Sequence, residues 1–186
     1  MLLWLLKWHF RLRGWKMVRP LPEEIRRCII LVAPHTSAWD FVYGAGARLH
    51  MRLETLFLAK QELFRWPIRS LLLRLGGVPV DRSKRVGLTE TLTTWLRERD
   101  PCRIVITPEG TRQRNAQWKT GFYYAALGAG VPIALAYLDY ARKEAGFGPV
   151  WMPSGDLNKD WAIIRQFYET VTARHPERFA VPQEIP

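Results

Sequence analysis

Short apolar runs alternate along the chain with longer stretches whose apolar residues recur every three or four positions. The runs are rich in β-branched residues and end at Pro, Gly or polar residues, as buried strands do. This pattern predicts strands over residues 28–33, 56–59, 103–107 and 131–138, and a short extended segment over 78–80. Helical spacing predicts helices over about 40–51, 71–75, 88–96, 122–129, and from 154 or 158 to 171. The alternation indicates an α/β fold: a single layered domain with a mixed, largely parallel sheet flanked by helices.

The N-terminus has a different pattern. Met1–Leu6 is apolar, and cations then alternate with Trp and Phe up to Arg19. A membrane-spanning helix needs about 20 mostly apolar residues, so this run is too short to cross a bilayer. We expect residues 1–20 to form an amphipathic helix that lies on the membrane surface, followed by the main globular domain over 21–186. The alternative is an apolar helix docked on the protein's own core.

Charge and tryptophan content narrow the range of partners. The chain has 28 Lys and Arg against 17 Asp and Glu, a net charge of +11, which favours phosphate-bearing partners. The nine tryptophans suit the headgroup layer of a bilayer. One class of protein with these features is a non-catalytic basic protein that binds anionic membrane or single-stranded nucleic acid. No nucleic-acid motif is present in the sequence. Cys28 and Cys102 lack the spacing of metal ligands, so we expect no metal.

The first candidate site follows the first predicted strand, in the segment Pro34–Asp40. His35 leaves the strand, and Asp40 comes five residues later, near the start of a helix. A carboxylate folded back onto the imidazole fixes its tautomer and stabilises the cation, which suits a general base. The alternative is structural: Ser37 caps the helix with Asp40 at its third position, and His35 is merely a polar strand end.

The second candidate site, Thr107–Arg112, also follows a predicted strand. Gly110 allows a ligand close to the backbone, and Thr111 and Arg112 offer a hydroxyl and a guanidinium that suit a phosphate. Glu109 is expected to orient Arg112 or the acceptor. The alternative is a charged turn with a local pair between Glu109 and Arg112.

In this order the segments resemble the glycerolipid acyltransferases of the lysophosphatidic acid acyltransferase type. That family carries His and Asp separated by four residues, a Gly…Asp-Arg segment, Pro-Glu-Gly-Thr-Arg, and an apolar Val-Pro-Ile. The matching residues here are His35 and Asp40; Gly77, Asp81 and Arg82; Pro108–Arg112; and Val131–Ile133. The resemblance covers about residues 30–136.

The resemblance implies an enzyme at the cytoplasmic face of the membrane, peripheral or monotopic. It would move a fatty acyl group from acyl-CoA or acyl carrier protein to the hydroxyl of a lysophospholipid such as 1-acylglycerol 3-phosphate, without a bound cofactor. The implied roles are general base for His35, its partner for Asp40, and acceptor phosphate binding for Glu109, Gly110, Thr111, Arg112 and Arg82. No acyl-enzyme is expected, because the chain lacks a Gly-x-Ser-x-Gly turn and Ser37 is only two residues from His35.

Overall fold

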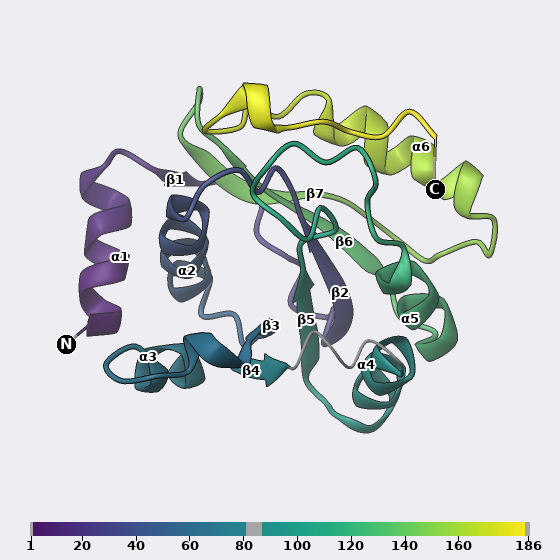
Figure 1. Cartoon of the computed structure of the whole chain (residues 1–186), viewed down its shortest axis with the longest axis horizontal. Coiled ribbons are helices and arrows are strands. Elements are labelled where there is room, and N and C mark those ends of the chain that lie inside the picture. Colours follow the sequence, from purple (N-terminus) through teal and green to yellow (C-terminus); the bar gives the residue numbers. More distant parts are fainter. Residues whose placement is uncertain (1, 81–86, 185–186) are drawn as a thin grey trace.

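The computed structural model of the chain describes residues 2–80 and 87–184. The helices are α1 (Leu2–Leu12), α2 (Trp39–Met51), α3 (Arg69–Arg74), α4 (Leu88–Glu98), α5 (Gly121–Ala129) and α6 (Leu157–Tyr168), with 3-10 turns η1 (Gln61–Leu63) and η2 (Pro176–Arg178). The strands are β1 (Lys16–Met17), β2 (Arg27–Val32), β3 (Leu56–Lys60), β4 (Gly77–Val80), β5 (Cys102–Ile106), β6 (Ile133–Asp139) and β7 (Glu144–Trp151). Figure 1 shows the strands forming one sheet with helices around it.

The described strands form one sheet in the order β1-β7-β6-β2-β5-β3-β4. Neighbouring strands run parallel, except that β6 and β7 are antiparallel. The expected α/β fold with a mixed, largely parallel sheet is therefore confirmed. Because β2 lies between β6 and β5, and all three are parallel, the loops that follow them meet at one edge of the sheet, where α/β folds place their sites.

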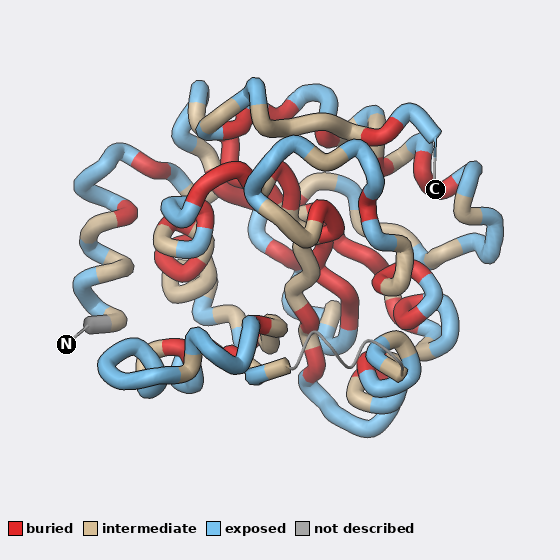
Figure 2. The backbone as a smooth tube through the Cα atoms, viewed as in Figure 1, coloured by how far each residue is buried: buried red, intermediate tan, exposed pale blue. Residues whose placement is uncertain are grey.

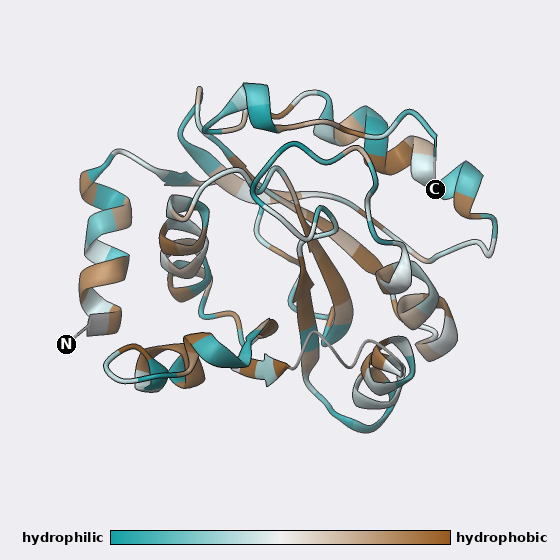
Figure 3. Cartoon of the chain, in the orientation of Figure 1, coloured by the Kyte–Doolittle hydropathy of each residue, from teal (hydrophilic) through white to brown (hydrophobic). Residues whose placement is uncertain are grey.

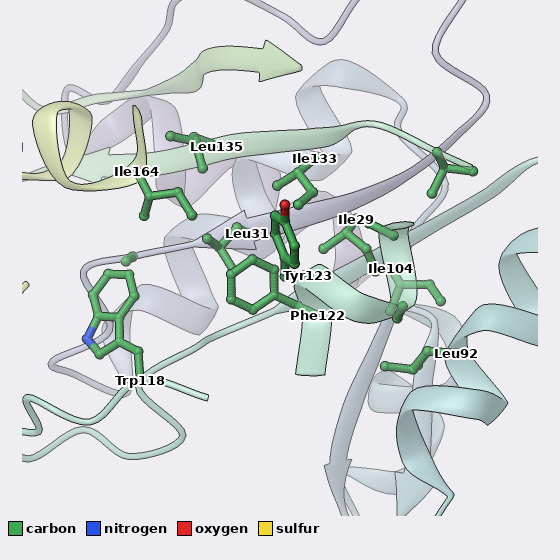
Figure 4. Close-up of a cluster of buried hydrophobic side chains, with 14 of the residues drawn as sticks. Ile29, Leu31, Leu92, Ile104, Trp118, Phe122, Tyr123, Ile133, Leu135 and Ile164 are labelled. Carbon is green, nitrogen blue, oxygen red and sulfur yellow. The ribbon is translucent and has the colours of Figure 1, made fainter. Parts of the chain in front are cut away.

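Helices cover both faces of the sheet, because successive residues of a buried strand point to opposite sides. Ile29 and Leu31 of β2 join a core with side chains of α4, α5 and α6. Figure 4 shows part of this core, with Trp118 from the loop after β5 beside it. Ile30 faces the other side, where Met51 at the end of α2 packs. The central strands are accordingly the most deeply buried part of the backbone (Figure 2).

The N-terminal helix packs against α2 rather than standing alone (Figure 1). Phe10 of α1 is buried in a cluster with Trp15, Tyr43 and other residues. The helix ends at Leu12, short of the 20 residues expected, and Lys16–Met17 pairs with β7 as an edge strand. In the part of the chain that the structure describes, no helix has the length and apolar character needed to cross a bilayer.

Other differences from the expected elements concern the C-terminal third. Strand β7 was not predicted, because Gly146, Gly148 and Pro149 interrupt the apolar pattern that marks strands. Helix α6 is capped by neither of the expected residues. Asp156 is its N-cap, and its Oδ1 accepts the Lys159 N–H at 3.2 Å.

Candidate active site

His35 and Asp40 lie together at the carboxyl end of β2. The segment after β2 carries His35, and Asp40 is the second residue of α2. His35 Nδ1 is 3.3 Å from Asp40 Oδ2, and the two side chains are 24% and 4% exposed. The imidazole is thus accessible to a substrate while its carboxylate partner is shielded from water. This arrangement allows Nε2 to act as a base while Asp40 holds the other ring nitrogen.

Asp40 is also held by the turn in front of its helix. Its Oδ2 accepts the N–H groups of Thr36 and Ser37, each at 2.8 Å, and Ser37 Oγ accepts the Trp39 N–H at 3.2 Å. The capping arrangement considered for this segment is wrong, because the N-cap of α2 is Ala38 without a side-chain hydrogen bond and Asp40 is the second helical residue. Asp40 nevertheless stabilises the turn while it contacts His35. The two roles do not compete for the carboxylate.

A third interaction with Asp40 comes from a distant part of the chain. The Tyr140 hydroxyl, just after β6, donates to Asp40 Oδ1 at 2.6 Å. Burial alone would raise the pKa of Asp40, but hydrogen bonds from His35, Tyr140 and the Ser37 amide outweigh it and hold this pKa below its usual value. Asp40 is therefore ionised at neutral pH and available to stabilise an imidazolium.

Glu109 supports the turn that carries His35 from the loop after the neighbouring strand β5. Its carboxylate is buried and accepts the backbone N–H of His35 at 2.6 Å. Burial raises the pKa of Glu109 to about 8, the His35 N–H opposes this shift, and the charge of Asp40 adds to it. Within the described residues Glu109 makes no ion pair with Arg112, and its Oε2 is buried without a hydrogen-bond partner. Glu109 thus contacts the main chain of His35, a role not anticipated from the sequence.

The rest of the Pro108–Arg112 loop is shaped by its backbone. Gly110 has a φ of +66°, in the left-handed region that favours glycine, and a Cβ there would lie 3.0 Å from Lys119 Nζ. Thr111 Oγ1 accepts the Gln113 N–H at 3.2 Å. Arg112 is exposed and makes no hydrogen bond or ion pair with residues 2–80 or 87–184. Lys119 is a cation at this loop that no motif in the sequence marks.

Arg82, expected at the acceptor phosphate, lies outside the described residues. The remaining expected residues fall on two loops, after β2 and after β5, that lie on adjacent parallel strands. The bond from the His35 N–H to Glu109 joins the two loops directly. Sequence spacing alone predicted the strand ends but not this contact, because the two residues are 74 positions apart.

Aromatic side chains connect the candidate site to α1. Trp39, beside Asp40, stacks with His9 of α1 at 5.8 Å between ring centroids. Trp15 stacks with Tyr43 at 4.6 Å and meets Tyr140 edge-on at 5.0 Å. The N-terminal segment is therefore part of the packing around the carboxylate and not an independent appendage.

Comparison with known proteins agrees with this arrangement. The chain matches the family model described as Acyltransferase over residues 12–137. It is 33% identical over 121 residues to a 1-acyl-sn-glycerol-3-phosphate acyltransferase of Salmonella typhimurium, covering 62% of this chain and 48% of that protein. With the enzyme of that name from Haemophilus influenzae it is 28% identical over 138 residues, covering 68% and 56%.

The chain thus spans about half the length of the curated relatives that it matches. A structural comparison pairs it with the crystal structure of the 1-acyl-sn-glycerophosphate acyltransferase of Thermotoga maritima. The TM-score is 0.59 at 22% identity, over 94% of this chain and 78% of that one. That likeness concerns the fold. Since the family model covers most of the chain, including both candidate loops, the protein belongs to the acyltransferase family.

Proposed function

We propose that the protein transfers a fatty acyl group from an acyl thioester to the hydroxyl of a lysophospholipid such as 1-acylglycerol 3-phosphate. The observation that carries this proposal is the pairing of an accessible His35 with a buried, ionised Asp40. The names of the relatives add support, since those proteins are called 1-acyl-sn-glycerol-3-phosphate acyltransferases. The donor is acyl-CoA or acyl carrier protein, and no cofactor takes part.

The reaction proceeds as a direct transfer. Asp40 favours the tautomer of His35 that carries its proton on Nδ1, which leaves Nε2 free to accept a proton. The acceptor hydroxyl oxygen attacks the thioester carbonyl carbon while its proton passes to Nε2. The tetrahedral intermediate then collapses, the C–S bond breaks, and the departing sulfur takes the proton from the imidazolium. A thiol pKa near 8.5 makes this sulfur a fair leaving group.

A covalent route through Ser37 fits the geometry less well. Ser37 is largely buried and its Oγ already accepts the Trp39 N–H. The proposal therefore predicts turnover in the Ser37→Ala variant and no acyl adduct trapped on the wild-type protein. An adduct that disappears together with activity in this variant would favour an acyl-enzyme instead.

The acceptor phosphate is proposed to bind at the loop after β5. Arg112 is exposed and unpaired within the described residues, and Gly110 lets the Lys119 side chain lie close to the backbone of this loop. Thr111 and Lys119 add a hydroxyl and a cation beside it. Arg82 is assigned to the same phosphate on the family resemblance alone.

We further propose that the protein sits on the cytoplasmic surface of the membrane as a peripheral or monotopic protein. One face of α1 is docked on α2, and the other presents Trp4 and Trp8, which are 63% and 50% exposed. Figure 3 shows apolar and polar residues side by side on this helix. Lys7 and Arg11 supply charges for lipid phosphates. Both expectations for this segment, docking on the core and an outward membrane face, are therefore compatible.

A second exposed surface fits the same role. Trp66, between η1 and α3, is 92% exposed, and Leu63, Ile68 and Leu73 nearby are also exposed. Arginines flank these side chains at positions 65, 69 and 74. Apolar side chains interleaved with arginine suit the boundary between headgroups and acyl chains.

Offering the purified protein a panel of lysolipids with acyl-CoA or acyl carrier protein tests the proposal. Mass spectrometry should detect the diacyl product from 1-acylglycerol 3-phosphate with wild type and at most a trace with His35→Ala. Acyl transfer to no lysolipid, or equal transfer by both proteins, would contradict the proposal. Co-sedimentation with anionic vesicles, compared with a salt-dependent oligonucleotide shift, separates the enzyme from the nucleic-acid-binding alternative.

A further inference from the structure

A segment near the C-terminus, outside the family match, is bonded to the candidate active site. We call residues 172–175, between α6 and η2, the C-terminal strap. The Thr172 carbonyl accepts the Tyr140 N–H at 2.9 Å, and the His175 N–H donates to Thr36 Oγ1 at 3.2 Å. Thr36 is buried next to His35. The strap is therefore held beside the turn that carries His35, and Figure 1 shows the yellow C-terminal segment running along the top of the view.

Arg174 is the charged residue that the strap brings to this position. Its guanidinium carbon lies 5.5 Å from the centre of the Trp39 ring and 5.7 Å from that of the Tyr140 ring. Trp39 directly precedes Asp40 in the chain, and Tyr140 donates to Asp40. Arg174 is therefore held beside the residues that support the His35–Asp40 pair.

No carboxylate among the described residues pairs with Arg174 within 4.0 Å, although its side chain is exposed. The ring contacts and a hydrogen bond with the Tyr140 hydroxyl position the guanidinium, and its other N–H donors remain available to a ligand. Arg178, in η2 just after the strap, differs in this respect, since its Nε lies 3.6 Å from Glu177 Oε1. Arg174 is thus a positioned cation whose charge the described part of the protein does not neutralise.

Arg112 and Arg174 approach the site from opposite sides of β2. Arg112 follows β5 on one side, whereas Arg174 packs on Tyr140, which follows β6 on the other. The reaction proposed above involves two substrates that both carry phosphate groups. A lysophospholipid has a headgroup phosphate, and coenzyme A or the carrier-protein arm has its own. A single cationic loop does not account for both.

Resting on the proposed acyl transfer, we propose that Arg174 binds a phosphate group of one of the two substrates, with Trp39 and Tyr140 holding its guanidinium in place. Arginine suits this role because its planar fork can donate two parallel hydrogen bonds to phosphate oxygens. The phosphate comes either from the acceptor headgroup or from the thioester donor, and the experiment below separates these sources.

Steady-state kinetics of wild type, Arg174→Ala and Arg174→Lys provide the first arm. Loss of a charge-assisted contact should raise the KM for the phosphate-bearing substrate about 10- to 100-fold while kcat changes little. A rise in KM for 1-acylglycerol 3-phosphate, but not for phosphate-free 1-acylglycerol, identifies the acceptor. A rise in the KM for acyl-CoA identifies the donor. Arg174→Lys should fall between the other two, because it keeps the charge without the fork.

Arg178→Ala is the matched control, since Arg178 follows the strap and already has a carboxylate partner. It should leave both KM values unchanged. If Arg174→Ala alters neither KM, or lowers only kcat for all substrates alike, Arg174 is no phosphate ligand and the proposal is wrong.

A binding arm keeps the two proposals separate. Calorimetric titration of glycerol 3-phosphate and of coenzyme A into wild type and Arg174→Ala needs no turnover. If wild type transfers no acyl group yet one of these probes binds about tenfold more weakly to Arg174→Ala, acyl transfer fails and the Arg174 site stands. Equal binding of both probes to both proteins overturns the Arg174 site whatever the activity.

Discussion

Tyr140 donates a 2.6 Å hydrogen bond to Asp40 across a sequence separation of 100 residues. The carboxylate oxygen that accepts it, Oδ1, is the one that faces away from His35, whose Nδ1 contacts Oδ2. The two oxygens of Asp40 are thereby assigned to different partners. The Tyr140 ring packs edge-on against Trp15 and Tyr43. Packing between the N-terminal segment, α2 and the end of β6 therefore determines how the Asp40 carboxylate is oriented.

Removing this hydroxyl tests whether Tyr140 orients Asp40 or merely fills space. Tyr140→Phe keeps the ring but loses a bond to a charged group, a contribution of about 1.5–3 kcal/mol at most. We expect kcat to fall by about 10- to 100-fold with KM nearly unchanged. The pKa of Asp40 should rise without this donor, so activity is lost at a higher pH on the acidic side than in wild type.

Tyr43→Phe is the control for this experiment. Tyr43 belongs to the same aromatic cluster, but its hydroxyl makes no hydrogen bond to the described residues. The two variants remove the same atom from neighbouring rings. If both change kcat and its pH dependence equally, the effect comes from packing and not from the bond to Asp40.

Substitutions in the His35–Asp40 pair should affect turnover and leave the fold intact. General base catalysis contributes about 10²–10⁴-fold, so His35→Ala should lower kcat by at least about 100-fold. Asp40→Asn should also lower kcat, because an amide neither stabilises the imidazolium nor selects its tautomer. Circular dichroism and thermal melting verify that both variants are folded. Wild-type turnover by folded His35→Ala would remove the general base from the mechanism.

The contacts of Asp40 illustrate how far a sequence can predict a site. His35 and Asp40 are five residues apart, and a strand end followed by a helix start brings them together through local geometry. Tyr140 and Arg174 reach the same place only through the order of strands in the sheet. No periodicity or motif marks them, because their position depends on tertiary contacts between residues 100 or more positions apart.

The fold shows the same limit. The β-branched run of β2 is buried on both faces and that of β5 is buried or half-buried along its length, so their composition predicts them as strands. Strand β7 carries two glycines and a proline and lies between β1 and β6, and its pairing rather than its composition makes it a strand. Glu109 is a further case. A carboxylate three residues before Arg112 suggests a local ion pair, but the buried Glu109 side chain accepts the His35 N–H instead.

The environment of Glu109 gives a prediction for stability. Its pKa rises from 4.5 to about 8 on folding, so the folded state favours the protonated form. The contribution of this group to stability is therefore complete below pH 4.5 and is lost as pH rises toward 8. Glu109→Gln stays neutral at every pH and can still accept the His35 N–H. The Tm of this variant should match wild type near pH 4.5 and exceed it increasingly up to pH 8.

Thermal melts at half-unit pH steps measure this difference directly. Because both proteins share every other titratable group, the difference between their Tm values isolates Glu109. A constant difference across the range from 4.5 to 8 would show that Glu109 titrates as an ordinary carboxylate.

The exposed tryptophans predict how the protein meets a membrane. Substituting Trp4 and Trp8 together with Ala should weaken binding to anionic vesicles by about tenfold or more, given the apolar area each side chain exposes. Trp66→Ala should weaken binding in a separate arm, because it lies on a different element. Raising the salt concentration should also lower the amount of protein that co-sediments with the vesicles, since salt screens the arginine contacts. Trp95→Ala, on α4, is the control and should bind as wild type does.

Two glycines of α2 provide a matched test of how α1 is attached. Gly44 and Gly46 are two residues apart in α2, so they point to nearly opposite sides of the helix. A Cβ at Gly46 would lie 2.8 Å from Phe10 Cβ and 3.2 Å from the Leu6 carbonyl oxygen of α1, whereas a Cβ at Gly44 meets nothing within 4 Å. Gly46 therefore permits the close packing of the two helices, and Gly44 does not take part in it.

Replacing each glycine with alanine should change stability in opposite directions. Gly44→Ala removes backbone entropy from the unfolded chain and should stabilise by about 0.5–1 kcal/mol. Gly46→Ala has the same gain but forces α1 away from α2, at a cost of about 1–3 kcal/mol for overpacking. Chemical denaturation should thus show Gly44→Ala above wild type and Gly46→Ala below it. If Gly46→Ala instead stabilises as much as Gly44→Ala, α1 is not held against α2 in solution, and the aromatic connection from α1 to Asp40 does not exist there.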